Sequence, residues 1–363
     1  MISKWLWRAG WLLLPLAWLL HRFVHDDAVV FFVACASLIP LANTMGDATE
    51  ELAKRIGPGA GSLLNATFGN AAELILGIAA LRHGHVDLVK GSITGSILAN
   101  LLLVGGASIV TGGVRFSRLR FNRLAASSSV STLFLAVVAM VVPTLLSLGG
   151  NPRYDPALLS EEICAVLIVM YALSIWFGLR THREEMGTSR EELHATPAEA
   201  AASRPRAPVH QRPLGYDLGR LLIAAAATAV ASELVVSALN GTVTALHLPE
   251  TFVGVVIVAI VGNAAEHSTA LMFARRGDMD VALGIAWESS KQIALLVAPV
   301  LVIAGALLGA PMDLAFSRLE VVALGIAVIA LAMIALDGET HWLEGAFLLA
   351  VYAVLGMGFY FVG

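Results

Sequence analysis

The sequence predicts an all-α polytopic membrane protein, and three observations carry this prediction. Hydrophobic residues make up 58% of the chain and charged residues only 14%, whereas a soluble domain carries about 45–50% and about 25%. The hydrophobic residues are gathered in runs of about 20, the length that crosses a bilayer as a helix. The pentapeptide Gly-Asn-Ala-Ala-Glu also occurs twice in such runs, at residues 69–73 and 262–266. The chain is therefore predicted to contain duplicated membrane segments.

About eleven apolar runs are candidate transmembrane helices. By residue number they are 4–21, 28–54, 62–82, 88–111, 124–148, 157–180, 215–240, 250–275, 280–309, 316–336 and 341–362. The first run starts with basic residues, as a signal peptide does, but no small-residue cleavage site follows it. We therefore expect a retained extra helix within residues 1–24, outside the duplicated part of the chain.

The duplication divides the remaining chain into two repeats. Residues 25–181 form the first and residues 214–363 the second, joined by a long polar linker at 182–213. Five predicted helices lie on each side of the linker, and because five is odd, the second repeat enters the membrane from the opposite face. Inverted repeats are typical of secondary transporters with a site near the bilayer midplane. Three further pairs match at the same offset as the pentapeptides: Gly91 with Gly284, Ser96 with Ser289, and Val104 with Val297.

Loop cations predict the orientation, because cytoplasmic loops are enriched in Lys and Arg. With a cytoplasmic N-terminus, the cytoplasmic face carries Lys54, Arg55, Arg115, Arg118, Arg120, Arg123, the linker arginines, Arg275 and Arg276. The other face keeps Arg22, Arg82, Lys90, Arg153 and Arg318. The N-terminus and the linker are therefore predicted to be cytoplasmic.

The duplicated pentapeptide places Glu73 and Glu266 inside hydrocarbon, where a charged side chain costs at least ~2.5–3.5 kcal/mol and by default marks a functional site. Asn70 precedes Glu73 by three residues, so both side chains would project from one helix face, and Asn263 precedes Glu266 likewise. If the repeats cross at the midplane, the two carboxylates face each other with an amide beside each. Amide and carboxylate oxygens without thiolates suit a hard cation such as calcium.

A second acidic layer precedes each pentapeptide. Thr49-Glu50 lies in the second predicted span and Ser232-Glu233 in the seventh. Four carboxylates in a membrane cannot all stay ionised without a cation, so protons would compete with the metal for them. Two protons or one divalent cation neutralise the same pair of charges, which is the chemistry of an antiporter. Glu50 has an alternative place, at the membrane interface beside Lys54.

Small residues in the fourth span have a simpler interpretation. Gly91 and Gly95 form a Gly-x-x-x-Gly pattern, and such a pattern lets a neighbouring helix approach closely. We predict that these two glycines serve helix packing.

These motifs resemble those of the calcium/proton exchangers of the cation/calcium exchanger superfamily. The resemblance rests on the two pentapeptides, the preceding Thr-Glu and Ser-Glu, and the stretch Gln292-Ile-Ala-Leu-Leu-Val-Ala-Pro. It implies an extra first helix, two inverted repeats of five helices and a central calcium site. Carried over by position, the calcium ligands would be Glu73 and Glu266 with Asn70 and Asn263, and the proton-linked carboxylates would be Glu50 and Glu233.

The resemblance also sets the expected partners and location. Calcium and protons would be transported ions, with no resident cofactor, no nucleic acid and a lipid bilayer as surroundings; association into a homo-oligomer is left open. The expected location is a bacterial inner membrane. The linker glutamates resemble a shortened acidic cytoplasmic segment; they are Glu184, Glu185, Glu191 and Glu192.

One stretch departs from the family pattern. Where small hydroxyl residues usually precede the glutamine of the ninth span, this chain has Glu288 and Lys291, three residues apart. An internal ion pair on one helix face is the favoured interpretation, and a tethered cation that weakens metal binding is the alternative. The other pathway candidates are Ser289, Ser290, Gln292 and His267, of which His267 either relays protons or points to a different helix face.

The function predicted from these residues is secondary active antiport of calcium against protons by alternating access. Sodium- or potassium-coupled calcium exchange on the same scaffold is the near alternative, and a Glu-lined cation channel is the alternative from another class. The sequence has no Gly-x-Ser-x-Gly, His-Glu-x-x-His or Walker motif, each of which would indicate an enzyme or a pump. We therefore predict a transporter rather than an enzyme.

Overall fold

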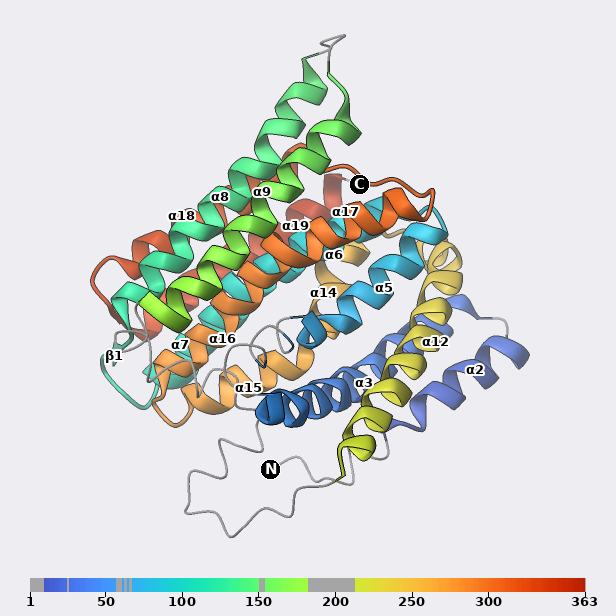
Figure 1. Cartoon of the computed structure of the whole chain (residues 1–363), viewed down its shortest axis with the longest axis horizontal. Coiled ribbons are helices and arrows are strands. Elements are labelled where there is room, and N and C mark those ends of the chain that lie inside the picture. The colour runs from blue at the N-terminus through green and yellow to red at the C-terminus, as the bar shows by residue number, and fades with distance from the viewer. Residues whose placement is uncertain are drawn as a thin grey trace.

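The computed structural model is a bundle of helices (Figure 1) and describes residues 10–24, 26–56, 61, 64, 67–149, 154–181 and 213–362. The linker glutamates lie outside these residues. The helices are α2 (Leu13–Phe23), α3 (Asp27–Ile56), α5 (Ala71–Arg82), α6 (Val86–Leu98), α7 (Gly105–Gly113), α8 (Arg123–Leu148), α9 (Pro156–Trp176), α12 (Leu214–Leu246), α13 (Glu250–Phe252), α14 (Ala259–Gly262), α15 (Ala264–Ala274), α16 (Met279–Gln292), α17 (Ala298–Leu307), α18 (Arg318–Ala335) and α19 (Trp342–Val362). The π-helical segments η1 (Ala99–Val104), η2 (Phe177–Thr181), η3 (Val253–Val258) and η4 (Ile293–Val297) continue some of them, and the strands β1 (Leu119–Arg120) and β2 (Glu339–Thr340) pair antiparallel.

The predicted all-α membrane class is confirmed. Eight helices in the described residues are long and apolar enough to cross a membrane, and a bent pair, Glu250–Gly262 with Ala264–Ala274, makes a ninth candidate. The predicted spans 4–21 and 62–82 correspond to shorter described helices, α2 and α5, of 11 and 12 residues.

Two predicted spans are broken helices rather than continuous ones. Asn70 leaves helical geometry (φ −100°, ψ 20°) directly before α5, and Asn263 does the same (φ −93°, ψ 8°) directly before α15. The second break bends the chain by 60°. The expectation of one continuous helix through each pentapeptide is therefore wrong, because each Asn is the residue at which a new helix begins. Hydropathy gave no sign of either break.

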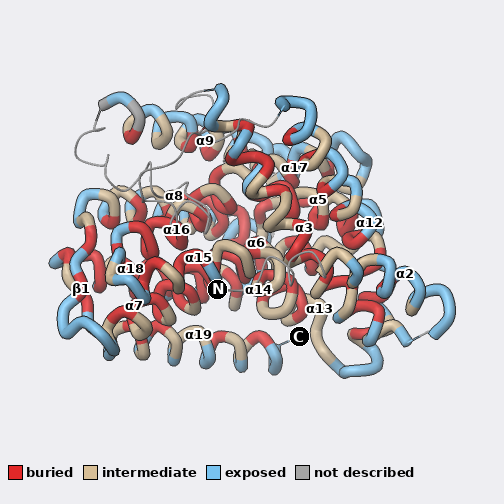
Figure 2. The backbone as a smooth tube through the Cα atoms, turned by 90° about the horizontal axis from the view of Figure 1, so that it is seen from below, coloured by how far each residue is buried: buried red, intermediate tan, exposed pale blue. Residues whose placement is uncertain are grey.

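The most deeply buried long helices lie at the centre of the bundle. In the most apolar stretch of each helix, 83% of the residues are buried for Val86–Gly113 and 67% for Met279–Leu307, but only 22% for α9 and for α19. Figure 2 shows the same distribution, with buried residues concentrated in the interior elements. α3 packs more extensively on α12 than on any other element, and α2 lies against α3. Polar residues on the central helices are thus removed from lipid.

The central helices approach closely through glycines, as the Gly-x-x-x-Gly pattern predicts. A Cβ on Gly91 would lie 2.8 Å from the Thr251 carbonyl oxygen, and a Cβ on Gly95 would overlap the Val255 carbonyl. The packing role of Gly91 and Gly95 is therefore confirmed: they allow α6 to pack closely against the backbone of α13 and η3.

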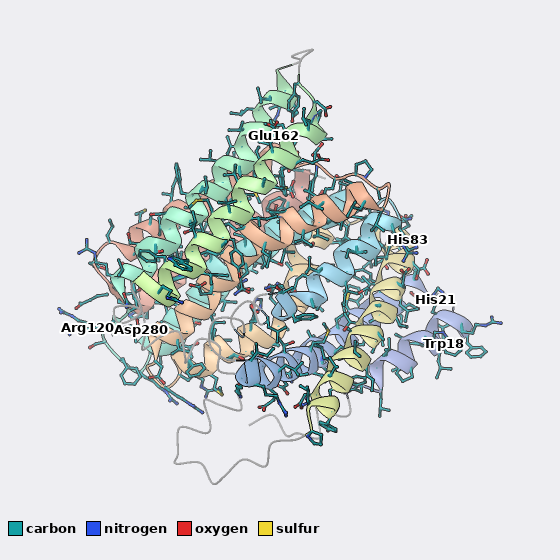
Figure 3. The ribbon with its side chains drawn as sticks, viewed as in Figure 1. Trp18, His21, His83, Arg120, Glu162 and Asp280 are labelled. Atoms are coloured by element: carbon teal, nitrogen blue, oxygen red, sulfur yellow. The ribbon has the colours of Figure 1, made fainter. Side chains whose placement is uncertain are left out.

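Two of the basic loops predicted to share one face, those that carry Arg115–Arg123 and Arg275–Arg276, lie together. β1 pairs with β2, Arg115 Nη1 donates to the Arg275 carbonyl at 3.1 Å, and the Asn122 backbone N–H donates to Asp280. Figure 3 shows Arg120 and Asp280 at this end of the molecule and His83 at the other.

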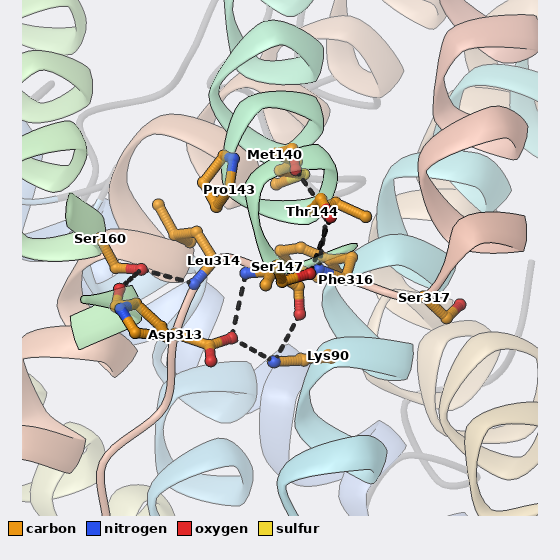
Figure 4. A network of polar contacts seen from close by, with 12 residues as sticks. Lys90, Met140, Pro143, Thr144, Ser147, Ser160, Asp313, Leu314, Phe316 and Ser317 are labelled. Atoms are coloured by element: carbon orange, nitrogen blue, oxygen red, sulfur yellow. Dashed lines mark hydrogen bonds and ion pairs between the residues drawn. The ribbon is translucent and has the colours of Figure 1, made fainter. Parts of the chain in front are cut away.

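At the far end, an extended segment between α17 and α18, residues 310–317, is inserted among the helices (Figure 4). The Leu314 backbone N–H donates to Ser160 Oγ at 2.9 Å, and the Phe316 backbone N–H donates to Thr144 Oγ1 at 3.0 Å. The hydroxyls on α8 and α9 thus supply the partners that buried backbone groups require.

Lys90 of α6 fastens the same segment. Its Nζ donates to Asp313 Oδ1 at 2.6 Å and to the Ala315 carbonyl oxygen at 2.7 Å, with 13% of the lysine side chain exposed. A charged lysine therefore links the first half of the chain to a loop of the second.

Replacing Lys90 with Met should lower stability by about 2 kcal/mol, the loss of hydrogen bonds from a charged donor. The double change Lys90→Met with Asp313→Asn should recover part of it, since the lone carboxylate is removed as well. Thermal unfolding in detergent measures both, with Arg318→Met, an exposed cation beside the same segment, as the control. Equal midpoints for Lys90→Met and the control would contradict this role.

Candidate functional site

The structure brings Glu73 and Glu266 together at the centre of the bundle. Glu73 lies in the first turn of α5 and Glu266 in the first turn of α15. A Cβ on Gly262 would lie 3.4 Å from Glu73 Oε1, so the Glu73 side chain reaches the start of the second pentapeptide. The charges of the two glutamates act on each other. The duplicated motif thus supplies one carboxylate from each half to a shared place.

The helix breaks explain why carboxylates fit there. The first turn of a helix exposes backbone N–H groups without intrahelical partners, and the helix dipole is positive at that end. The Glu73 carboxylate accepts a hydrogen bond from its own backbone N–H. A negative side chain in the first turn of a half-helix is therefore better placed than one in the middle of a continuous helix.

The two asparagines form reciprocal hydrogen bonds between the halves. Asn70 Nδ2 donates to Gln292 Oε1 at 2.6 Å, and Asn263 Nδ2 donates to Ser96 Oγ at 2.8 Å. Both asparagines are 1% exposed. Each pentapeptide is therefore hydrogen-bonded to a central helix of the opposite half, α16 for Asn70 and α6 for Asn263.

Several buried oxygens at and around this place have no hydrogen-bond partner among the described residues. They are Glu73 Oε2, Glu266 Oε2 and Asn263 Oδ1. Each buried unsatisfied group costs about 1–3 kcal/mol, so the arrangement calls for a proton or a cation. The described residues contain no cluster of three or more His, Cys, Asp or Glu side chains. The donor set is two carboxylates with neutral oxygens, which fits a hard cation.

The second acidic layer is separated from the carboxylate pair. Glu50, 5% exposed, has its carboxylate 2.5 Å from Nζ of Lys54, the neighbour expected in the alternative interpretation. The Glu233 side chain is 43% exposed and lies 3.6 Å from both Arg82 and His83. Arg82 ends α5, so at ~1.5 Å per residue its backbone is about 13 Å along the helix from that of Glu73. The four carboxylates do not form one cluster.

Glu288 and Lys291, which depart from the family pattern in the ninth predicted span, form the ion pair within one helix that their spacing favoured. Lys291 Nζ lies 2.5 Å from Glu288 Oε1, and the lysine is 2% exposed. Ser290, by contrast, donates to the Ala286 carbonyl of its own helix at 2.9 Å. The interpretation of Lys291 as a cation paired within its own helix is confirmed.

His267 is joined to the site through a residue that the sequence analysis missed. Its Nε2 lies 3.2 Å from Asn100 Oδ1, and Asn100 Nδ2 donates to Ser289 Oγ at 2.9 Å. Ser289 is in turn hydrogen-bonded to the Glu266 carboxylate. Asn100 has no duplicated counterpart in the sequence, because the matching position in the second half is Ile293. The available signal was a lone amide in an apolar run.

Comparison with known proteins gives consistent matches over nearly the whole chain. The sequence model described as sodium/calcium exchanger protein matches residues 27–180 and 217–361. A Ca(2+)/H(+) antiporter of Aphanothece halophytica is 41% identical over 96% of this chain and 95% of its own length. The Ca(2+)/H(+) antiporter ChaA of Bacillus subtilis is 40% identical over 92% of each chain. The solved structure of native YfkE superposes with a TM-score of 0.80 at 36% identity, covering 97% of this chain and 100% of its own.

Replacing Lys291 alone with Ala should destabilise the protein by about 3 kcal/mol, the low end for breaking a buried pair, because Glu288 keeps 19% of its side chain exposed. Replacing Lys291 and Glu288 together with Ser should be nearly neutral. Thermal unfolding in detergent compares the two variants. The control is Arg120→Ala, which breaks an ion pair whose Arg120 side chain is 76% exposed and whose Glu339 side chain is 35% exposed; it should lower stability by less than about 1 kcal/mol. A double variant as unstable as the single one would refute the pairing account.

Proposed function

The chain belongs to the sodium/calcium exchanger protein family, and we propose that it is a secondary active antiporter that exchanges calcium for protons across a membrane. It is an integral membrane protein and a transporter rather than an enzyme. The observation that carries this proposal is the buried pair Glu73 and Glu266, one carboxylate from each half. The named Ca(2+)/H(+) antiporters at about 40% identity support the same reaction.

The chemistry of the pair explains how the two ions are coupled. Two ionised carboxylates in a low-dielectric interior repel each other and lack solvation. One calcium ion neutralises both, and two protons do the same. In this proposal the loaded site is neutral in either form, and the empty ionised form is too costly to change its exposure across the membrane. Calcium and protons are therefore exchanged rather than leaked.

Glu73, Glu266, Asn70 and Asn263 are the proposed calcium ligands. Their carboxylate and amide oxygens are the hard donors that calcium takes, and Asn263 Oδ1 has no hydrogen-bond partner in the described part of the chain. Gln292 and Ser289 line the site as polar neighbours: Gln292 accepts from Asn70, and Ser289 contacts Glu266.

Glu50 and Glu233 are proposed as proton-linked carboxylates outside the calcium ligands. Glu233 is paired with Arg82 and His83 at the end of α5, away from the central pair. Glu50 lies beside Lys54 near the end of α3. In this arrangement a proton reaches the central pair in steps rather than by titration of one crowded cluster.

The proposed topology is eleven transmembrane helices, arranged as one extra helix followed by two inverted repeats. The proposed mechanism is alternating access, in which the site opens to one side of the membrane at a time. Both pentapeptides break their helix at the Asn, and the π-helical segments η1 and η4 fall at matching places in the two halves. Half-helices that meet at the midplane are a feature of such transporters. The boundaries proposed are 1–24 for the extra helix, 25–181 and 214–363 for the repeats, and 182–213 for a cytoplasmic linker. A bacterial inner membrane is the proposed location, in keeping with relatives from bacteria.

The alternatives have less support. Relatives with high identity are named for proton rather than sodium or potassium coupling. A channel would leave unexplained why the two pentapeptides are hydrogen-bonded across the halves of one chain, since channel pores are typically lined by rings of equivalent groups.

Glu73→Gln and Glu266→Gln should each reduce calcium uptake into everted vesicles to near the background of empty vesicles, because a divalent ion would be left half neutralised. Uptake is measured against imposed proton, sodium and potassium gradients, which also tests the coupling ion. Glu162→Gln, an exposed glutamate on α9, is the matched control. Parental transport by either central variant would refute the role of the pair, and uptake driven by sodium or potassium alone would replace protons as the coupling ion.

Calcium affinity should rise with pH. Only the ionised carboxylates bind calcium, so binding must release protons, and acid must weaken it. Isothermal calorimetry in buffers of different ionisation enthalpy measures the protons released, and the observed heat should vary linearly with that enthalpy. Equal heats in all buffers would argue against proton coupling at this site.

A further inference from the structure

Asn100 is a buried residue of the first half, and both its amide nitrogen and its amide oxygen form hydrogen bonds with the second half. It lies in η1, is 1% exposed, and contacts two residues of the second half. Its Nδ2 donates to Ser289 Oγ at 2.9 Å, and its Oδ1 lies 3.2 Å from His267 Nε2. Neither the duplicated motif nor the proposed calcium ligands include it.

The directions of these hydrogen bonds follow from the groups involved. An amide oxygen only accepts, so His267 Nε2 must carry the hydrogen. Ser289 Oγ accepts from the Asn100 amide, which leaves the Ser289 hydrogen for the Glu266 carboxylate that it contacts. Donation therefore runs in one direction, from His267 through Asn100 and Ser289 to Glu266. Hydrogen bonds in such a chain polarise and strengthen one another.

No corresponding chain of donors reaches Glu73 within the described residues. Ser96, which matches Ser289, likewise accepts from an asparagine amide, Asn263 Nδ2 at 2.8 Å, but only Ser289 has a hydrogen bond to a central carboxylate among the described residues. The residue that matches Asn100 is Ile293, which is 1% exposed and has no polar side-chain atom. The two carboxylates come from equivalent motifs but have different neighbours.

We propose that Asn100 is a positioning residue for the exchange reaction: it holds the Ser289 hydroxyl on Glu266 and is itself held by the N–H of His267. Glu266 is thereby the oriented ligand of the pair, and Glu73 is the ligand that adjusts to the ion. His267 contributes a fixed hydrogen-bond donor and carries no transported proton. This inference rests on the proposed function, whose site it refines.

The first test compares Asn100→Ala, Ser289→Ala and the double variant by the KM for calcium and the maximal rate of proton-driven uptake. Each single change should raise KM by about tenfold, the effect of one lost hydrogen bond to a charged group, with the maximal rate within about twofold of parental. The double variant should match the larger single effect, because Asn100 acts through Ser289. Fold-changes that multiply, or an unchanged KM in Asn100→Ala, would overturn the proposal.

The second test uses His267 and keeps the question answerable if Asn100→Ala does not fold. His267→Gln retains an N–H donor for Asn100 but cannot carry a proton at neutral pH, and His267→Leu removes the donor. The Gln variant should keep parental KM and pH profile, and the Leu variant should raise KM severalfold, an effect that disappears in a Ser289→Ala background. Loss of transport or a shifted pH profile in a folded His267→Gln variant would overturn the proposal.

Controls separate this inference from the function it refines. Ser108→Ala changes a fully buried hydroxyl further along the same membrane segment, on α7, and should leave KM unchanged. A parental protein that exchanges no calcium for protons would refute the proposed function itself. A normally exchanging parent with an unaffected Asn100→Ala variant would refute only the positioning role.

Discussion

The mutual repulsion of two carboxylates buried at the centre of a membrane bundle is the constraint on which the rest of the structure depends. Glu73 and Glu266 lie where solvation is poor and their charges act on each other. Both helices are broken at the Asn three residues before the Glu, so that each carboxylate lies in the first turn of a new helix. The N-terminus of a helix carries a partial positive charge, which lowers the cost of the buried carboxylate. The two most buried long helices include α6 and α16, which pack against α5 and α15, and the site's remaining charge is left for an ion or protons to neutralise.

Much of this architecture could be predicted from the sequence, and the failures have physical reasons. Composition and run length identify the membrane class because hydrocarbon demands apolar segments of about 20 residues, and the duplicated pentapeptide identifies the central carboxylates because a repeated charge in lipid is costly. The Glu288–Lys291 pair was predictable from local spacing. The helix breaks were not, since a single Asn among small residues does not interrupt an apolar run of about 20 residues. The separation of Glu233 from Glu73 depends on where α5 ends against α12, a tertiary fact. Asn100 was hidden because its match is apolar.

Polar groups are treated differently at the ends of the bundle and at its centre. At one end, the segment 310–317 has backbone N–H groups paired with Ser160 and Thr144, and Lys90 is paired with Asp313. At the centre, oxygens of Glu73, Glu266 and Asn263 have no partner among the described residues. A fully satisfied network favours one geometry, whereas an unsatisfied oxygen has free energy to gain from a ligand. The fully hydrogen-bonded end can hold the helices in place, while the central oxygens that lack hydrogen bonds are available to coordinate an ion.

Duplication alone would make the two carboxylates equivalent, but the chain has departed from its own symmetry around them. In the first half, Gly95 and Leu98 occupy the positions that Glu288 and Lys291 occupy in the second, and Asn100 stands where the second half has Ile293. Gly95 is required there by the close approach of the Val255 backbone, so the first half has no room for a charged pair. The second half instead encloses an ion pair in α16, and its Ser289, which is hydrogen-bonded to Glu266, accepts a hydrogen bond from Asn100 of the first half. Two carboxylates with unequal hydrogen bonding differ in the free energy of accepting a proton, so protons would enter and leave the pair in a preferred order. An exchanger gains from such an order, because a half-protonated site then has one dominant form rather than two competing ones.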